Sequence, residues 1–205
     1  GGDGDDSLDG GAGIDLASYA TATAAVTVNL ALATQNTGGG GTDSMTGIEG
    51  VIGSDFADTL NGNASDNILV GGAGNDTING RAGADAMSGG LGDDRFYVDN
   101  AGDTVGELGG QGADYVYATV DFTLGAGESV EKVYASAAGL TLTGNELANL
   151  LCGCAGADTL VGGGGADALY GQGGADIMRG ETGNDRYFVD NAGDQVIEAI
   201  DQGTL

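Results

Sequence analysis

Residues 71–79 read GGAGNDTIN, and residues 162–170, which lie 91 positions later, read GGGGADALY. Both stretches begin with a glycine-rich turn whose sixth residue is an aspartate, and both continue with a short segment whose eighth residue is apolar. The same nine-residue frame extends outward from them, running from Gly53 in a first array and returning from Gly144 in a second. A fixed period of this kind predicts a solenoid, in which each unit buries its apolar residue against its neighbours.

Two positions of this frame stay in phase through both arrays. Position six holds a carboxylate or its amide, namely Asp58, Asn67, Asp76, Asp85, Asp94, Asp103, Asn149, Asp158, Asp167, Asp176, Asp185 and Asp194. Position eight holds an apolar or aromatic residue, namely Leu60, Leu69, Ile78, Met87, Phe96, Val105, Leu151, Leu160, Leu169, Met178, Tyr187 and Val196. A preference of Asp and Gly for turns does not explain why positions six and eight keep the same spacing in every repeat. We therefore expect the position-six residues to share a ligand and the position-eight residues to form a common core.

The composition is extreme for a folded chain, because 44 glycines accompany 31 acidic and only 5 basic residues, for a net charge of −26. A charge of this size ordinarily favours disorder. Here, however, 12 of the 24 aspartates occupy position six of a repeat, including Asp6 and Asp15 in a pair of N-terminal repeats. Carboxylates that are held in register predict a bound cation.

The same composition argues against two kinds of partner. Nucleic-acid binding needs clustered Lys and Arg side chains, and the 5 basic residues of this chain are scattered. The most apolar stretch, residues 24–33, is short and is interrupted by Thr27 and Asn29, so it does not predict a transmembrane segment. We therefore expect an acidic protein that binds neither nucleic acid nor the membrane interior.

Each repeat has the chemistry of half a cation site. Glycine permits the backbone conformations that point carbonyl oxygens into a tight turn, and the aspartate adds a charged oxygen. The next three residues predict a short strand, so that coils would stack about 4.8 Å apart and two stacked turns would hold one ion. Ca²⁺ accepts six to eight oxygen ligands in flexible geometry, whereas soft metals favour Cys or His, and the chain has no histidine.

These residues resemble the RTX, or haemolysin-type, calcium-binding repeats of bacterial secreted proteins, whose consensus is GGxGxDxUx. The best matches are residues 71–79, residues 162–170 and GGDGDDSLD at the N-terminus. The resemblance implies an all-β fold, a parallel β-roll or β-solenoid, with several Ca²⁺ ions between turns that lie 18 residues apart in the sequence. It also implies a secreted or cell-surface location.

In that family an ion takes two carbonyls and the aspartate of one turn and the same groups of the turn 18 residues later. The strongest implied pairs are Gly72, Gly74 and Asp76 with Gly89, Leu91 and Asp94, and Gly163, Gly165 and Asp167 with Gly180, Thr182 and Asp185. Further implied pairs are Asp85 with Asp103, Asp158 with Asp176, and Asp176 with Asp194. The complete set of implied ligands adds Asp6, Asp15, Asp58, Gly80, Ala82, Gly83, Asn100, Gly156, Gly171, Gly173, Gly174 and Asn191.

Several turns depart from the consensus. Asn67 and Asn149 replace the aspartate, and Phe56 and Leu147 replace the glycine at position four, so we expect weak binding or none in the first turns of each array. Asp6 and Asp15 have no partner 18 residues later, and their ions would depend on repeats further upstream. With these exceptions, the resemblance implies about six to eight ions.

The repeats divide the chain into five segments. We interpret residues 1–18 as the end of an upstream array, 53–114 as the first array and 144–205 as its duplicate. The segments between them, 19–52 and 115–143, alternate as strands do, with Val26, Val28, Leu30 and Leu32 on one face and Val116, Ala118, Val120, Phe122 and Leu124 on another. We expect them to continue the solenoid without the calcium turn.

No catalytic site is predicted. Without histidine no nucleophile and base can be paired, and Glu128, Glu131 and Glu146 have the pattern of solvated surface acids. Cys152 and Cys154 are the only thiols and are interpreted as small residues beside a turn. The aromatic residues at the end of each array, Tyr97 and Phe188 among them, are interpreted as plugs of the core rather than a sugar-stacking surface.

The expected function is that of a calcium-binding structural segment of a larger secreted or surface bacterial protein of the adhesin, fibre or surface-layer type. Such a segment would fold on binding Ca²⁺ outside the cell and would have no activity of its own. The alternative is a C-terminal accessory module of a secreted protease, lipase or epimerase whose catalytic domain lies upstream, and a glycan-binding module is a third reading. Neighbouring repeats or further copies of the protein are the expected macromolecular partners.

Overall fold

The computed structural model describes residue 2 and residues 4–198, and every regular element in that part of the chain is a β-strand. The last residues of the predicted second array, 199–205, lie outside the described residues. Two compact units can be distinguished, Gly1–Gly112 and Ala113–Leu205. No helix that could cross a membrane is present among the described residues.

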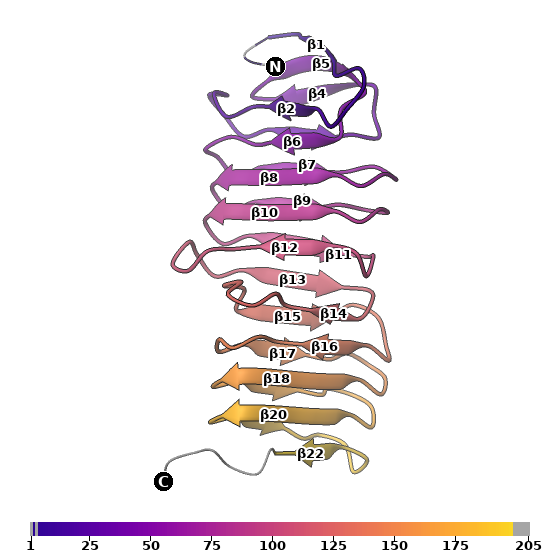
Figure 1. Cartoon of the computed structure of the whole chain (residues 1–205), viewed down its shortest axis with the longest axis vertical. Coiled ribbons are helices and arrows are strands. Elements are labelled where there is room, and N and C mark those ends of the chain that lie inside the picture. Colours follow the sequence, from indigo (N-terminus) through magenta and orange to yellow (C-terminus); the bar gives the residue numbers. More distant parts are fainter. Residues whose placement is uncertain (1, 3, 199–205) are drawn as a thin grey trace. The chain divides into compact units, whose positions relative to one another are not determined.

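The first unit is a stack of short parallel strands arranged on different sides of a common core. One sheet has the order β12-β10-β8-β6-β2, and a second contains β11, β9, β7 and β3 as neighbours; Figure 1 shows β6, β8 and β10 one below another. The strands of this unit are β1 (Ser7–Asp9), β2 (Leu16–Ser18), β3 (Thr27–Asn29), β4 (Thr34–Gly38), β5 (Gly41–Thr46), β6 (Gly50–Ile52), β7 (Thr59–Asn61), β8 (Ile68–Ala73), β9 (Thr77–Asn79), β10 (Ala86–Leu91), β11 (Arg95–Val98) and β12 (Thr104–Gly106).

The register of these strands confirms the predicted parallel β-solenoid. Ile68 of β8 pairs with Ala86 of β10, and Thr59 of β7 pairs with Thr77 of β9, so partners are 18 residues apart. One coil therefore consists of two nine-residue repeats, and repeats of the same parity stack on the same side.

Position eight of each repeat forms the core of the first unit. Side chains alternate across a strand, so in a three-residue strand only the middle one points inward. Accordingly Leu60, Leu69, Ile78 and Phe96 are fully buried, and Met87 and Val105 are at most 5% exposed. The flanking residues of the strands, at positions seven and nine, face outward, and many of them are polar, as Thr59 and Asn61 are in β7.

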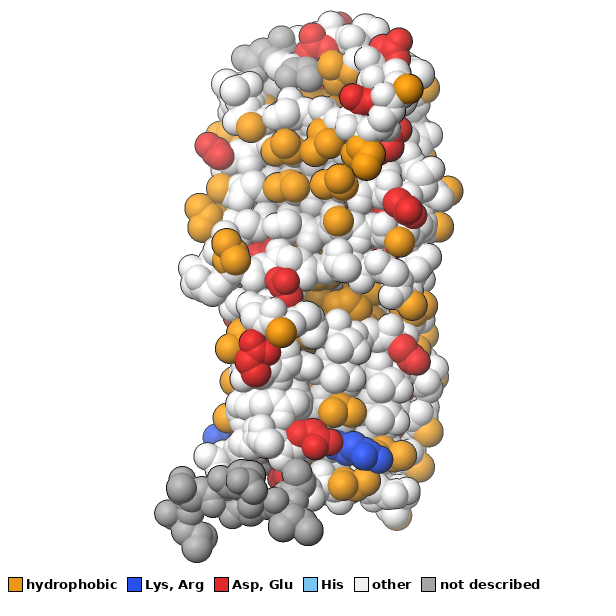
Figure 2. Space-filling model, in the orientation of Figure 1, with side chains coloured by type: hydrophobic (Ala, Val, Ile, Leu, Met, Phe, Trp, Pro, Cys, Tyr) orange, Lys and Arg blue, Asp and Glu red, His pale blue; other side chains and the backbone are white. Residues whose placement is uncertain are grey.

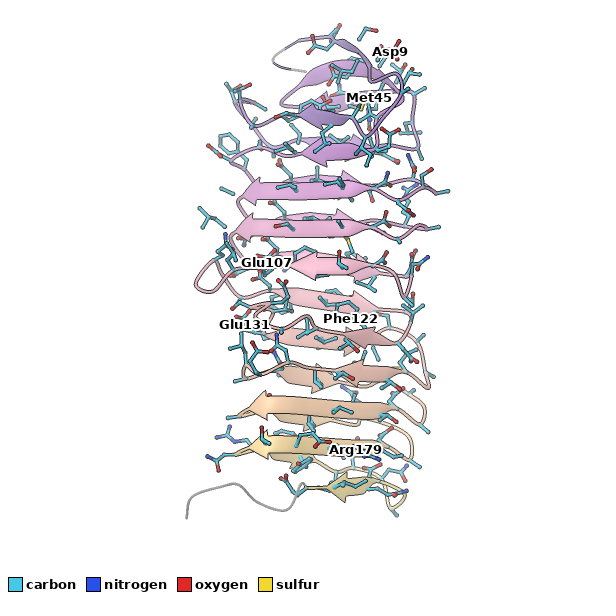
Figure 3. The ribbon with its side chains drawn as sticks, in the orientation of Figure 1. Asp9, Met45, Glu107, Phe122, Glu131 and Arg179 are labelled. Carbon is cyan, nitrogen blue, oxygen red and sulfur yellow. The ribbon has the colours of Figure 1, made fainter. Side chains whose placement is uncertain are left out.

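Residues 19–52 form strands as predicted, but not with the predicted face. Val26 and Val28 are buried, whereas Leu32 is 48% exposed, so its assignment to the same face was wrong. The reason is a turn after β3, in which the Leu32 N–H bonds the Asn29 carbonyl at 3.0 Å and ends the strand. The chain then forms an antiparallel pair, β4 with β5, in a sheet of order β1-β5-β4. Met45 of β5 points toward the interior (Figure 3) and is 6% exposed.

The second unit repeats the same construction. Its sheets contain β13-β15-β17-β19-β21 and β14-β16-β18-β20-β22 as neighbours. Leu160 of β18 pairs with Met178 of β20, again 18 residues apart. The strands are β13 (Tyr115–Ala118), β14 (Phe122–Thr123), β15 (Lys132–Ala135), β16 (Thr141–Thr143), β17 (Leu150–Cys152), β18 (Thr159–Gly165), β19 (Ala168–Tyr170), β20 (Ile177–Gly183), β21 (Arg186–Phe188) and β22 (Gln195–Ile197).

The core of the second unit follows the prediction except at its end. The interpretation of Phe188, and of Tyr97 in the first unit, as plugs of the core was wrong, because these side chains are 43% and 39% exposed. Leu151, Leu160, Leu169 and Met178 are fully buried. Val196 is 44% exposed because β22 is the last described strand, so no described coil covers it. In the connecting segment, Val116, Ala118, Phe122 and Leu124 are buried, but they belong to two strands and the turn that follows rather than to one continuous face.

Truncating one position-eight residue should destabilise the fold strongly. Leu160→Ala leaves a cavity between two coils and is expected to lower the free energy of unfolding by about 2–5 kcal/mol. Leu147→Ala, at a side chain that is 40% exposed, is the matched control and should cost less than about 1 kcal/mol. Urea unfolding in saturating Ca²⁺ measures both, and equal losses would contradict the assignment of the core.

Candidate metal sites in the glycine-aspartate turns

The position-six carboxylates lie inside the turns rather than on the surface. Asp76, Asp94 and Asp176 are fully buried, and Asp85, Asp158 and Asp167 are 1% exposed. Figure 2 accordingly shows the acidic side chains of one face scattered mostly singly, although the chain carries 31 of them. Buried carboxylates are costly unless hydrogen bonds or a cation compensate their charge.

One carboxylate oxygen has the same role in every stacked pair of turns. The Oδ1 atom accepts a hydrogen bond from the backbone N–H of the position-six residue that lies 18 residues earlier. In the first unit the Asp58 N–H donates to Asp76 at 2.7 Å, and the Asp76 N–H donates to Asp94 at 2.7 Å. In the second unit the Asp167 N–H donates to Asp185 at 2.9 Å. These bonds align the carboxylates in columns along each unit.

The second oxygen divides the turns into two classes. In the class that we name closed turns, a backbone N–H near the start of the turn donates to the side-chain oxygen of position six. Ser54 donates to Asp58 at 2.5 Å, and Cys154 donates to Asp158 at 2.8 Å. The closed turns are those of Asp6, Asp58, Asn67, Asp103, Asn149, Asp158 and Asp194.

In the class that we name open turns, the Oδ2 atom is buried and has no hydrogen-bond partner. The open turns are those of Asp15, Asp76, Asp85, Asp167, Asp176 and Asp185. Each has a residue with positive φ at position two, in the same order Gly11, Gly72, Arg81, Gly163, Gln172 and Glu181. None of the closed turns shares this feature. The left-handed residue thus accompanies a carboxylate oxygen that the turn itself does not satisfy.

Three of these left-handed residues carry a side chain. Arg81, Gln172 and Glu181 have φ of 64°, 65° and 69° and are the only non-glycine residues with positive φ among those described. The conformation costs roughly 1–2 kcal/mol per residue. Backbone strain of this kind persists where surrounding structure or function requires it.

In the open turns of Asp76 and Asp167, as in the closed turn of Asp58, a backbone carbonyl of the next turn lies close to the position-six carboxylate. A methyl group built on Gly71 would collide with Asp76 Oδ2 and would lie 2.6 Å from the carbonyl oxygen of Gly89. Its duplicate Gly162 would meet Asp167 Oδ2 and, at 2.8 Å, the carbonyl oxygen of Gly180. Only glycine fits at this point, where a carboxylate of one turn and a carbonyl of the next converge. Such a set of hard oxygens suits Ca²⁺.

Burial raises the pKa of four open-turn carboxyls, those of Asp76, Asp85, Asp167 and Asp176. The pKa of Asp76 rises to about 7, because burial disfavours the charged form and because Asp94 and Asp58 lie nearby. The pKa of Asp85 and that of Asp167 rise to about 6, again mainly through burial. Burial also raises the pKa of Asp176. A bound proton or a bound cation would each relieve the cost of burying these carboxyls.

The structure stacks the two strongest sequence-predicted pairs as expected. Gly72 pairs in register with Gly90, and Ala73 with Leu91, so the turn of Asp76 lies on the turn of Asp94. The carbonyl of Leu91, a predicted ligand, accepts the Gly74 N–H at 2.7 Å. In the second unit Gly164 pairs with Thr182 and Gly165 with Gly183, which stacks the turns of Asp167 and Asp185.

Other sequence-predicted ligands lie in closed turns. Asp103 accepts the N–H groups of Asp99 and Asn100, each at 3.1 Å. Asp194 is held in the same way by Asp190 and Asn191. Asp6, Asp58 and Asp158 are likewise occupied by N–H groups of their own turns. The remaining predicted positions, Gly80, Ala82, Gly83, Gly156, Gly171, Gly173 and Gly174, belong to stacked turns of the two units.

Sequence reasoning missed three glutamates that contact these turns. Glu107 is 2% exposed, and the Gly89 N–H donates to its Oε1. Glu49 accepts the Asp15 N–H at 3.0 Å, and Glu131 accepts the Asp114 N–H at 2.8 Å. Glu107 and Glu131 are labelled in Figure 3 beside their turns. All three lie outside the nine-residue phase, so the repeat pattern contains no signal for them.

Comparison with known families agrees with this geometry. The family described as RTX calcium-binding nonapeptide repeat (4 copies) matches residues 1–17, 52–87, 61–96, 71–105 and 155–187. No curated protein matches the chain.

The raised carboxyl pKa values predict that acid stabilises the metal-free fold. Asp76, Asp85 and Asp167 bind protons more tightly when folded, so their protonation favours the folded state at low pH and this contribution is lost as pH rises from about 4 to about 7. In chelator, the folded fraction measured by circular dichroism should therefore be larger at pH 5 than at pH 7.5. Asp76→Asn/Asp167→Asn should flatten the dependence. A folded fraction that grows with pH in chelator would refute the prediction.

The left-handed conformation at position two predicts an unusual stabilising substitution. Arg81→Gly removes the strain of a positive φ, whereas the greater freedom of glycine in the unfolded chain opposes this gain. The net effect should be an increase of about 0.5–1 kcal/mol in the free energy of unfolding. Ala82→Gly, at the next residue, has no such strain to relieve and should lower it by a similar amount. Thermal unfolding in Ca²⁺ distinguishes them, and a destabilised Arg81→Gly variant would contradict the proposed strain.

Proposed function

This chain belongs to the RTX calcium-binding nonapeptide repeat family, and we propose from that premise that its open turns hold Ca²⁺ and that the bound ions stabilise the solenoid. The observation that carries the proposal is the row of buried Oδ2 atoms without hydrogen-bond partners in the open turns. Such atoms are costly in an apolar environment unless a cation compensates them.

The ligand groups follow from the two turn classes. One site takes the Asp76 carboxylate with the Gly89 carbonyl, and its duplicate takes the Asp167 carboxylate with the Gly180 carbonyl, since these oxygens converge on one point. Asp85 and Asp176 have the same unsatisfied oxygen beside the position-one glycines Gly80 and Gly171. When bound, Ca²⁺ supplies the positive charge that lets neighbouring carboxylates ionise together.

Closed turns should contribute less to binding. Asp58, Asp103, Asp158 and Asp194 already accept N–H groups of their own turns, so a cation would have to displace those bonds. The proposal therefore assigns the ions to the aspartates of the open turns. The closed turns serve as hydrogen-bonded spacers between these sites.

Binding of this kind couples folding to the metal. Stacked carboxylates repel each other without ions, and with ions the free energy of binding becomes free energy of folding. Extracellular calcium modules bind at about 10⁻⁴–10⁻³ M. We propose that the chain is a non-catalytic structural segment that stays unfolded at the low calcium level of a cytosol and folds after export to the cell exterior.

A calcium titration followed by far-UV circular dichroism tests the proposal. The wild-type chain should gain β signal cooperatively with Ca²⁺ and not with Mg²⁺, because Mg²⁺ demands a stricter octahedral geometry. Asp76→Ala/Asp167→Ala should raise the calcium midpoint several-fold. Asp55→Ala/Glu146→Ala removes the same charge at exposed residues and should leave the midpoint nearly unchanged. A wild-type chain that is equally folded in chelator at neutral pH would defeat the proposed coupling.

A further inference from the structure

The turn of Asp15 is open, yet its stacking partner is not a repeat. Gly11 at position two has φ of 78°, and Asp15 Oδ2 is buried without a hydrogen-bond partner. Eighteen residues later the chain runs through the end of β3 and into the inserted hairpin, so the regular partner turn is missing. The repeat itself therefore supplies the ligands of one turn, and the ligands of a second, stacked turn must come from elsewhere in the chain.

The missing half is supplied by residues 47–49, after the hairpin of β4 and β5. The Gly10 N–H donates to the Thr46 carbonyl at 3.0 Å, and the N–H groups of Glu49 and Gly50 donate to the Asp15 carbonyl at 2.9 and 3.0 Å. These bonds place the segment directly on the turn of Asp15. The sequence expectation that Asp15 depends on an upstream partner overlooked this downstream segment.

Glu49 takes the place of a position-six aspartate in this segment. Its Oε2 accepts the Asp15 N–H at 3.0 Å, which is the bond that Asp76 Oδ1 forms with the Asp58 N–H. On its other side, the Glu49 carbonyl accepts the Ile68 N–H at 3.1 Å, as the Asp58 carbonyl accepts that of Thr77. Glu49 therefore belongs to the same column of carboxylates as the repeats.

The connection that carries Glu49 is short. Only three residues, Gly47 to Glu49, join β5 to β6, where the repeat has a six-residue turn. The additional methylene of glutamate extends the carboxylate over the gap. In the second unit Glu131 has the same role after a longer connection, residues 124–131: its Oε2 accepts the Asp114 N–H at 2.8 Å, and the Asp114 carbonyl accepts the Lys132 N–H at 3.1 Å.

A carbonyl oxygen completes the likeness to the regular sites. A methyl group on Gly10 would collide with the Gly47 carbonyl oxygen and with the Asp15 side chain, as one on Gly71 would with the Gly89 carbonyl and Asp76. A surface hollow of about 380 Å³, lined by Gly10, Asp15 and Ile48 among others, lies beside this turn.

We propose that Asp15, the Gly47 carbonyl and Glu49 form an additional Ca²⁺ site, in which an inserted segment replaces the partner repeat. The site rests on the proposed function of the open turns, but its ligands Gly47 and Glu49 lie outside every family match. Its ion ties the end of the β4–β5 hairpin to the solenoid. Calcium would then order the insertion as well as the repeats.

The neighbouring turn shows that this assignment is selective. Asp43 takes the partner role for Asp6, whose N–H donates to Asp43 Oδ1 at 3.0 Å. The other Asp43 oxygen, however, accepts the hydroxyls of Tyr19 at 2.7 Å and Thr37 at 2.9 Å. Hydroxyl groups there satisfy the buried carboxylate without an ion. The proposed site is thus confined to Asp15 and Glu49.

The test is a count of bound calcium ions per chain by native mass spectrometry, on the full chain. Glu49→Gln keeps the length of the side chain and an acceptor for the Asp15 N–H, and we expect it to bind one ion fewer than wild type. Asp15→Asn should lose the same single ion, and the double variant should lose no more than one. Glu146→Gln, at an exposed residue, should bind the wild-type number.

Hydrogen exchange of the wild-type chain provides a readout that does not depend on variants. Calcium should protect the amides of residues 10–15 and 47–49 together, and Glu49→Gln should lose that protection while residues 71–94 keep theirs. An unchanged ion count in both Glu49→Gln and Asp15→Asn, or a wild type without calcium-dependent protection at residues 47–49, would overturn the site while leaving the regular sites intact. A wild-type chain that binds no calcium would overturn the proposed function as well.

Discussion

The burial of a carboxylate, or of its amide at Asn67 and Asn149, in the stacked turns is the constraint on which the rest of this structure depends. A column of acids at the spacing of β-strands is repulsive and poorly solvated, so each turn must supply compensation. In the stacked pairs every Oδ1 atom accepts a hydrogen bond from a backbone N–H of the preceding coil. The second oxygen is compensated locally in closed turns, and in open turns it is left for an external charge.

The φ angle of the residue at position two distinguishes the open turns from the closed turns. Where position two is right-handed or extended, as at Ser54 or Cys154, its N–H reaches the carboxylate. Where position two is left-handed, as at Gly72 or Gln172, the oxygen remains without a partner. The ability of a turn to bind calcium therefore depends on its backbone conformation as much as on its aspartate. At Arg81, Gln172 and Glu181 this conformation carries the strain of a positive φ.

The irregular segments obey the same constraint with different residues. Asp43 is satisfied by the hydroxyls of Tyr19 and Thr37, and Glu49 reaches over a shortened connection to the turn of Asp15. An insertion that breaks the nine-residue phase can thus be accommodated, provided that its residues continue the column of acceptors. This continuity explains how a hairpin can be inserted into the first unit without interrupting its core.

The sequence by itself determined the period, the parallel stacking at 18-residue intervals, the position-eight core and the position-six carboxylates, because these depend on local spacing that recurs in every coil. Only the tertiary structure decided which carboxylates are open, because Asp158 and Asp167 have the same place in the repeat and differ in the direction of one N–H group. It also decided the partners of Asp6 and Asp15, because Asp43 and Glu49 reach them through a hairpin. Contacts made across an insertion have no fixed sequence offset, so no periodic pattern could reveal them.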